Sequence, residues 1–523
     1  MRPGEGKLNK EIMSRATLVA TVSSLSYTDE ARNGVEWKAS DWLEVRADLM
    51  PELDPAALRS VFRGSLLYSL RSCRSGGNEP SSLSDRCRRL RRAAHLYDLV
   101  DLEGDQDLSP ALLNSISPHR RVISWYGRAD HQFLQELLQV FSRTAARLYR
   151  FEISCSNVEE GIIALQFLYQ TQRADVTAYA TGPCGVWTRI LAPRVGAPIV
   201  FAGVGDGFRD KSNAPTVLEL IQDYGLPDIQ PVNQIFGIVG EPVSGSLSPR
   251  LHNAAHRACR ADRVFLSFPT RDFDRFWSQL VLGGDLETMG FAIKGLTVVS
   301  PNKQSALQVS GYVGRLCQQC KATNLLVNES DIWTARTTDP EGIFHHAVVR
   351  RTNLSGTRVA VVGCGGSGRV TAAALVQRGA EVTLVNRSSE RGKWAAHLLG
   401  LRFVPLKQFS PRGYSAMINA TPVGQSGDEL PISLKKLNPG SLIVDLAYKR
   451  KGQTPLVAAS QNLGHKVIEG RSVLLAQTMR QYGLMTGKRM PERLAREMLG
   501  IPTTHDPLDG VLFSKADKCT REG

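Results

Sequence analysis

Short apolar, β-rich segments alternate with helix-like segments over residues 16–205 of the chain. This alternation is typical of parallel strands that are joined by crossover helices. Eight strands within roughly 200 residues favour a closed TIM-type barrel, because an open doubly wound sheet usually has fewer strands. Functional residues are then expected at the carboxyl ends of the strands. The predicted strands are residues 16–23, 42–49, 65–72, 96–103, 120–126, 148–154, 175–182 and 198–204.

A glycine-rich turn stands between an apolar strand and an Ala-rich helix in the second half of the chain. The strand is predicted over residues 358–362 and the helix over residues 370–378. This order places backbone N–H groups and a helix N-terminus under a dinucleotide pyrophosphate. The residues predicted to bind the cofactor here are Gly363, Gly365, Gly366, Ser367 and Gly368.

The next predicted strand, residues 381–385, indicates which dinucleotide is bound. An NAD enzyme usually has Asp or Glu at the end of this strand, where the carboxylate binds the ribose hydroxyls. Here the strand is followed by Asn386, Arg387 and Ser388. Because an amide and a guanidinium suit a 2′-phosphate, NADP is favoured over NAD.

Composition describes a globular protein of two or three domains, with 523 residues of which 42% are apolar. No run of about 18 apolar residues occurs, and residues 1–10 lack a signal-peptide core, so a soluble, cytoplasmic protein without membrane contact is expected. The nine cysteines are scattered, which favours reduced thiols. Cys317 and Cys320 form a lone C-x-x-C that we interpret as a helix-borne pair, and no metal site is predicted.

The net charge of +14 does not by itself select a partner. Arginines cluster over residues 86–92, on a predicted helix whose apolar face carries Leu83, Cys87, Leu90 and Ala94. The arginines then fall mostly on the solvated face. Since no aromatic side chains interleave with them as a stacking platform, nucleic acid is not a predicted partner.

Charged residues stand at the predicted strand ends of the first half, including three in the segment Leu-Glu-Val-Arg-Ala-Asp that begins at Leu43. Burying three charges without a purpose is costly, although stabilisation of a barrel rim stays an alternative. Their order and spacing, with Gly76-Gly77 and Thr188-Arg189, resemble type I 3-dehydroquinate dehydratase over about residues 16–225. The residues that the resemblance identifies as a remnant of that site are Glu44, Arg46, Arg71, Glu103 and Arg189.

Two positions depart from the dehydratase pattern. The resemblance implies an imine-forming lysine at the end of the sixth strand, where this chain has Glu152, and a histidine at the end of the fifth, where it has Tyr126. Arg150 cannot replace the lysine because a guanidinium stays protonated. We therefore expect a degenerate barrel kept for stability, assembly or ligand binding, with an active dehydratase as the alternative. The lysines before residue 232 are Lys7, Lys10, Lys38 and Lys211.

A serine-rich segment, residues 244–249, precedes a predicted helix. Ser246 and Ser248 offer two hydroxyls beside the helix start, which can donate to one carboxylate without a counter-charge. This segment and residues 294–303, which end in Lys303, resemble shikimate dehydrogenases. The resemblance implies that Lys303 is catalytic and that Asp339 is its partner.

The resemblance extends over about residues 234–499. It implies that Asn324, Tyr448 and Gln477 face the substrate, whereas Thr421, Leu446 and Gly470 line the cofactor. Thr297 and Val299 replace the family's Asn and Thr. Since Val299 removes one hydroxyl from the substrate site, the exact substrate stays open between shikimate and quinate.

Lys303 and Asp339 have a clear chemical logic. Hydride addition to a ketone leaves an alkoxide, so a proton donor is needed, and a carboxylate can hold the ammonium in place. We predict an NADP-dependent shikimate dehydrogenase that reduces 3-dehydroshikimate in aromatic amino acid biosynthesis. The alternatives are a bifunctional enzyme with dehydratase activity, a quinate dehydrogenase, and a non-enzymatic metabolite sensor.

The expected fold is α/β in three modules. These are a TIM-type barrel over residues 1–228, a shikimate-binding domain over residues 233–342 plus 471–502, and a Rossmann NADP-binding domain over residues 343–470. Residues 503–523 have weak periodicity and are expected to be disordered. The whole resembles fused dehydroquinate dehydratase/shikimate dehydrogenase proteins. The sequence carries no signal for the oligomeric state.

Overall fold

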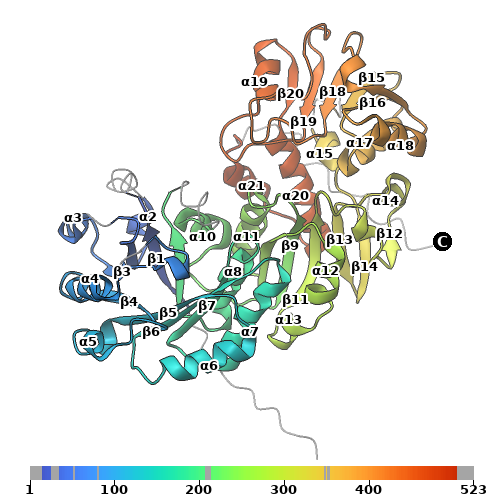
Figure 1. Ribbon diagram of the computed structural model, residues 1–523. Coiled ribbons are helices and arrows are strands. Elements are labelled where there is room, and N and C mark those ends of the chain that lie inside the picture. The colour runs from blue at the N-terminus through green and yellow to red at the C-terminus, as the bar shows by residue number, and fades with distance from the viewer. Residues whose placement is uncertain are drawn as a thin grey trace, which may run out of the picture.

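The chain folds around three sheets, which Figure 1 shows as a barrel, a lower right-hand domain and an upper domain. The computed structural model describes residues 14–24, 35–50, 53–78, 82–205, 214–346, 349 and 354–502. The tail predicted to be disordered, residues 503–523, lies outside the described residues, as do Lys7, Lys10 and Lys211.

The first sheet is a nearly closed parallel barrel, which confirms the predicted TIM-type fold. Its strands follow one another around the barrel, with β8 paired to β1. At the seam between β7 and β8, the Thr177 hydroxyl donates to the carbonyl oxygen of Ile199 at 2.9 Å. The strands are β1 Thr17–Val22, β2 Trp42–Arg46, β3 Ser65–Ser69, β4 Leu99–Glu103, β5 Arg121–Gly127, β6 Leu148–Ser154, β7 Val176–Thr181 and β8 Ile199–Gly203.

Helices surround this barrel, and apolar side chains such as Trp42 and Phe201 fill part of its interior. Side chains alternate between interior and exterior along each strand. Next to the apolar layer, the interior therefore carries a polar layer that includes Glu44, Asp101 and Arg150. The helices are α2 Val35–Lys38, α3 Pro55–Val61, α4 Leu83–Leu96, α5 Pro110–Leu113, α6 His131–Phe141, α7 Ile162–Thr171, α8 Val186–Val195 and α10 Val217–Tyr224.

Helix α4 carries the arginine cluster, and its orientation differs from the prediction at two positions. Arg86 is 3% exposed rather than solvated, because its Nε and Nη2 donate to Asp107 at 2.8 and 2.7 Å. A bidentate carboxylate makes such burial of a guanidinium tolerable. Leu83, expected on the apolar face, is 70% exposed at the first residue of the helix, whereas Leu90 and Ala94 are buried as predicted.

The second sheet has the strand order β10-β9-β11-β13-β14-β12. It shares one hydrophobic core with the barrel, and at their border Trp187 of α8 packs on Phe268 of β10 with ring centroids 5.8 Å apart. Its strands are β9 Gln234–Gly240, β10 Arg263–Pro269, β11 Ala292–Val298, β12 Tyr312–Val313, β13 Leu325–Glu329 and β14 Ile332–Arg336. Its helices are α11 Ser248–Ala258, α12 Phe273–Phe276, α13 Asp285–Thr288 and α14 Arg315–Cys320.

The third sheet is parallel, in the doubly wound order β17-β16-β15-β18-β19-β20 of a Rossmann domain. Two helices after it, α20 Gly470–Thr486 and α21 Glu492–Leu499, return to pack on α11. The strands are β15 Arg358–Val362, β16 Glu381–Asn386, β17 Arg402–Pro405, β18 Ala416–Asn419, β19 Leu442–Asp445 and β20 Lys466–Ile468. The helices are α15 Glu341–Phe344, α17 Gly366–Val376, α18 Ser389–Leu399 and α19 Pro455–Asn462.

Cys317 and Cys320 lie on α14 and are both buried. Cys320 packs against Ala322, Val370 and Ala373, so it joins the second domain to the Rossmann helix α17. Among the described residues, no group of three His, Cys, Asp or Glu side chains could hold a metal ion. Within the same ranges, none of the helices has the length and apolarity needed to span a bilayer.

Candidate functional site

A cavity of about 230 Å³ lies where the carboxyl ends of β9 and β11 face the glycine turn after β15. Helices α11 and α20 complete its wall. Most of the predicted dehydrogenase residues therefore meet in one place, although they lie far apart along the chain. The predicted residues in the lining are Ser246, Ser248, Val299, Lys303, Asn324, Asp339, Gly365, Gly366, Ser367, Leu446, Tyr448, Gly470 and Gln477.

Lys303 stands in the loop after β11 and reaches both domains that border the cavity. Its Nζ donates to Asp339 Oδ2 at 3.0 Å and to Ser367 Oγ at 2.7 Å. The side chains of Lys303 and Asp339 are 13% and 4% exposed. The ammonium group is thus held between Asp339 and the glycine turn, in the cavity that both domains border.

Asp339 is fixed from two further sides. Its Oδ1 accepts from Asn324 Nδ2 at 2.9 Å and from Gln477 Nε2 at 3.1 Å. Hydrogen bonds to an ionised carboxylate are stronger than neutral ones, so three donors hold this side chain in one orientation. Asp339 in turn holds the ammonium of Lys303 in the cavity.

A layer of polar residues behind Asn324 was missing from the sequence prediction. Asn324 Oδ1 accepts from Thr338 N at 2.9 Å, and Gln481 Nε2 donates to Thr338 Oγ1 at 3.1 Å. Thr297 Oγ1 lies 3.4 Å from Gln481 Oε1. Gln481 stands four residues after Gln477, which is the spacing of one helix face and could have identified it. Ser367 was predicted only for the cofactor, and its bond to Lys303 was not foreseen.

Neutral donors gather at the start of α11. Ser248 N donates to Ser246 Oγ at 3.2 Å, and Leu247 N donates to the hydroxyl of Tyr448 at 3.4 Å. Burial raises the pKa of Tyr448, and a hydrogen bond with Ser246 opposes this shift only in part. The phenol therefore keeps its proton at neutral pH. Together with the positive end of the helix dipole, these groups suit a ligand carboxylate.

The glycine turn fits a dinucleotide pyrophosphate. Gly363 has φ +106°, and a Cβ at Gly368 would lie 1.9 Å from the carbonyl oxygen of Gly363. No atom lies within 4 Å of the place that a Cβ on Gly365 would occupy, so open space adjoins the start of α17. Only glycine permits the bends, and the open space provides room for the phosphates. Gly470 is equally restricted, because a Cβ there would lie 2.1 Å from Ala447 O.

The residues after β16 lie beyond the cavity lining. Asn386 shapes the glycine turn, since its Oδ1 accepts from Cys364 N at 3.2 Å and its Nδ2 donates to Ser388 O at 2.8 Å. Ser388 caps α18, and Arg387 is exposed. Thr421, on the other side of the turn, donates to Asn419 Oδ1 at 2.6 Å. Arg387 is thus a charged group that stands open to solvent directly after β16.

A second cavity, of about 430 Å³, lies at the carboxyl ends of the barrel strands. Glu44, Arg46, Arg71 and Arg189, which the resemblance to the dehydratase singles out, line it. Glu103 does not line it, because its carboxylate accepts from the main-chain N and the hydroxyl of Ser72, both at 2.7 Å. Glu103 therefore anchors the loop after β3. The sequence could not reveal that its side chain points toward Ser72 and away from the cavity.

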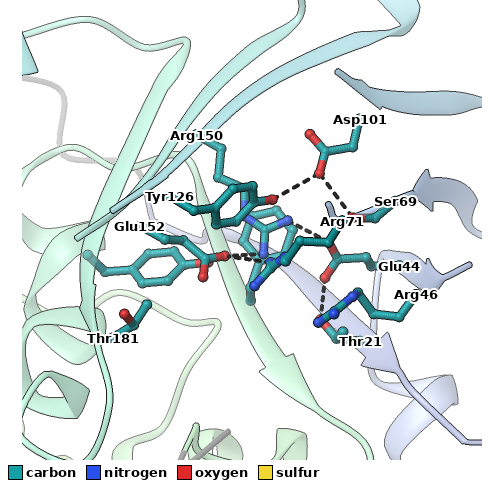
Figure 2. A network of polar contacts seen from close by, with 12 residues as sticks. Thr21, Glu44, Arg46, Ser69, Arg71, Asp101, Tyr126, Arg150, Glu152 and Thr181 are labelled. Atoms are coloured by element: carbon teal, nitrogen blue, oxygen red, sulfur yellow. Dashed lines mark hydrogen bonds and ion pairs between the residues drawn. The ribbon is translucent and has the colours of Figure 1, made fainter. Parts of the chain in front are cut away.

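Ion pairs occupy the barrel cavity, and Figure 2 shows how their side chains converge. Arg150 donates to Glu44 at 2.5 Å and also contacts Glu152, while Arg71 donates to Glu152 at 3.3 Å. Burial alone would raise the pKa of Glu152, but Arg150 and Arg71 outweigh it and hold that pKa below its usual range. Glu152 is consequently an ionised carboxylate that forms ion pairs with two guanidinium groups.

Tyr126 lies beside this network and was predicted only as the replacement of a histidine. Its hydroxyl donates to Asp101 at 3.0 Å, and the Arg71 guanidinium lies 3.9 Å from the centre of its ring. Burial raises the pKa of Asp101, although Arg150 opposes the shift. Asp101 was not predicted as a site residue, although it lies two positions before Glu103 on β4.

Comparison with known proteins assigns both halves of the chain. Residues 19–230 match the model of type I 3-dehydroquinase, and residues 238–326 match the shikimate dehydrogenase substrate binding domain. The shikimate dehydrogenase (NADP(+)) of Citrifermentans bemidjiense is 30% identical over 288 residues, which are 52% of this chain and 96% of that protein. The chain belongs to the shikimate dehydrogenase family. The predicted resemblance of each half is confirmed.

Two other known proteins are similar to different lengths of the chain. A chloroplastic bifunctional 3-dehydroquinate dehydratase/shikimate dehydrogenase of Arabidopsis thaliana is 24% identical over 490 residues, covering 87% of this chain and 79% of that protein. A crystal structure of shikimate 5-dehydrogenase from Thermus thermophilus with NADP(H) and shikimate is 28% identical. It covers 51% of this chain and 98% of its own, with a TM-score of 0.45.

Proposed function

We propose that the second half of the chain interconverts 3-dehydroshikimate and shikimate with NADP as cofactor. The observation that carries this proposal is the position of Lys303, whose ammonium bonds both to Asp339 and to Ser367 in the glycine turn. A proton donor and a dinucleotide site are thus separated by a single hydrogen bond. A metabolite sensor would need the cavity but would have no use for such a donor.

NADPH, when bound at the glycine turn, would supply the hydride that reduces the ketone. Lys303 would donate a proton to the ketone oxygen as negative charge develops there, and would take it back in the reverse direction. Asp339 fixes the ammonium, and Ser246 and Tyr448 offer hydroxyls to the substrate carboxylate. Arg387 would meet the 2′-phosphate with a planar, charged fork.

The test is the rate of NADPH formation from shikimate, followed by absorbance, with quinate and with NAD as comparisons. We expect shikimate and NADP to be the preferred pair. Quinate is the second candidate substrate, because Val299 lines the cavity without the hydroxyl that the family pattern implies there. A higher kcat/KM with quinate would support this alternative, and no turnover with either compound would refute the dehydrogenase proposal.

We further propose that the barrel does not dehydrate 3-dehydroquinate through an imine. Glu152 lies two residues before the end of β6, where the family pattern implies a lysine, and its carboxylate is bound by Arg150 and Arg71. The described residues that line the barrel cavity include no lysine. A guanidinium cannot form the imine, because it stays protonated and lacks a free amine. A bifunctional enzyme is the competing proposal, supported by the similarity to the bifunctional protein of Arabidopsis thaliana.

Borohydride separates these two proposals for the barrel. The protein is incubated with 3-dehydroquinate and borohydride, and its mass is measured alongside the absorbance of the enone product. We expect neither a covalent adduct nor enone formation. An adduct together with enone would refute the degenerate barrel and would direct attention to Lys211, whereas enone without an adduct would indicate dehydration by another route.

A further inference from the structure

The segment after β19 carries Tyr448 and then reaches across to the barrel. Arg450 Nη2 lies 2.5 Å from Asp223 Oδ2 and 3.3 Å from Glu219 Oε1, and both acidic residues belong to the last barrel helix, α10. The side chains of Asp223 and Arg450 are 5% and 23% exposed. A residue of the cofactor domain is therefore bound by a largely buried carboxylate of the barrel.

The same carboxylate binds the helix that begins with Ser248. Arg250 Nε donates to Asp223 Oδ1 at 2.6 Å, and Asn253 Nδ2 donates to the main-chain oxygen of Asp223 at 2.9 Å. Each oxygen of Asp223 thus has its own guanidinium, one from α11 and one from the segment after β19. Asp223 joins the two segments that bring Ser248 and Tyr448 to the substrate cavity.

Helix α20 fixes the segment from a third side. Arg471 Nη2 donates to Arg450 O at 2.9 Å and to Lys449 O at 3.2 Å. Tyr448 stands two residues before Arg450, and adjacent Cα atoms are about 3.8 Å apart, so a shift of Arg450 is passed on to the phenol. The hydroxyl of Tyr448 accepts from Leu247 N, next to Ser246.

We propose that Asp223 and Arg450 are positioning residues, through which the barrel sets the substrate site of the dehydrogenase. This inference rests on the proposed function of that site. Without Asp223, Arg450 would keep only the longer contact with Glu219, and without Arg450, Asp223 would keep only Arg250, so the segment after β19 would relax away from its position. The barrel then has a role in the dehydrogenase that requires no chemistry of its own. Lys303, Asp339 and the glycine turn make no bond to Asp223 or Arg450 among the described contacts.

The test measures kcat and both KM values for Arg450→Gln, Asp223→Asn and the double variant of the full chain. We expect KM for shikimate to rise about tenfold, within the usual coupling of contacting residues, while kcat and KM for NADP change less than about twofold. The double variant should be no worse than Asp223→Asn alone, because each single substitution removes the ion pair between Arg450 and Asp223, and Asp223→Asn also removes the one with Arg250. Arg450→Lys should recover part of the loss.

Arg88→Gln is the matched control, because Arg88 forms an exposed ion pair with Asp85 on α4, with side chains 79% and 46% exposed. It should leave all three constants unchanged. Unchanged KM for shikimate in Arg450→Gln and Asp223→Asn would overturn the inference. A fall in kcat together with a similar rise in both KM values, accompanied by a lower Tm, would also overturn it, because such changes would indicate a role in stability alone. An unmutated chain that neither turns over nor binds shikimate would instead refute the proposed function, and the inference with it.

Discussion

Lys303→Ala is the most direct test of the proposed chemistry. The substitution removes the ammonium and its two hydrogen bonds, at 3.0 Å to Asp339 and 2.7 Å to Ser367. A positioned general acid contributes about 10²–10⁴ in rate, which corresponds to about 3–5 kcal/mol in activation free energy. We therefore expect kcat to fall by about two to four orders of magnitude, with a much smaller change in KM for shikimate.

The substitution also affects stability, and the structure indicates how much. Asp339 keeps its bonds from Asn324 and Gln477, so the carboxylate loses one charged partner and retains two neutral donors. Since hydrogen bonds to charged groups contribute about 1.5–3 kcal/mol, the free energy of unfolding should fall by about that amount. Denaturant unfolding shows whether the variant is folded under the assay conditions. A kinetic loss that exceeds the unfolded fraction is then chemical.

Lys294→Ala serves as the control, because Lys294 belongs to β11, just before the loop that carries Lys303, and pairs with Asp331 at 3.9 Å on the surface. Exposed pairs contribute about 0–1 kcal/mol, so kcat should not change. The assay is NADPH formation from shikimate at saturating NADP. If Lys303→Ala keeps the kcat of the unmutated protein, Lys303 is not the proton donor and the proposed mechanism is wrong.

Two further predictions concern the cofactor and the barrel. Arg387→Ala should raise KM for NADP and leave KM for NAD unchanged, because the guanidinium is exposed beside the turn that would hold the ribose. Equal use of NAD and NADP by the unmutated protein would contradict this prediction. Glu152→Gln should lower the free energy of unfolding near neutral pH. The difference from the unmutated protein should shrink as the pH falls below about 4.3, because a carboxyl whose pKa is lowered by folding contributes stability that protonation removes. Urea unfolding of both proteins at about pH 7 and about pH 3.5 measures this difference. A difference that does not change with pH would refute the assignment of Glu152 as an ionised carboxylate.

The fold was predictable because each barrel strand is buried on both sides and is followed by a helix-like segment. Those two properties appear as contiguous apolar runs and helical periodicity, and all eight predicted strands are present. The sequence predicted the orientation of single side chains less well. Arg86 is buried because Asp107, which is 21 residues later, lies opposite it, and no local pattern carries that information.

In the candidate sites too, residues within a local motif were predictable, whereas contacts between distant residues were not. The dehydrogenase cavity was predictable from short ordered motifs, since Lys303, Asp339 and the glycine turn each carry a local signature. The contacts between motifs were not, and the bonds of Lys303 to Ser367 and of Arg450 to Asp223 join residues 64 and 227 positions apart. In the barrel, Glu103 was assigned to the cavity from its strand position, whereas the hydroxyl and main-chain N of Ser72 bind it elsewhere.

The chain passes between the substrate domain and the cofactor domain twice, through α15 and into α20 at Gly470. These two crossings pack against each other so closely that a Cβ on Gly342 would lie 2.8 Å from Val473 Cγ1 and 2.9 Å from Gln477 Cγ. A rotation of the cofactor domain about this pair would bend the chain where the two domains are joined covalently. Asp339 and Gln477 stand next to the axis and would move little, whereas Arg387, at the far end of β16, would travel through a wider arc. A hinge at this place would let the dinucleotide exchange while Lys303 keeps Asp339 and releases Ser367 of the cofactor domain.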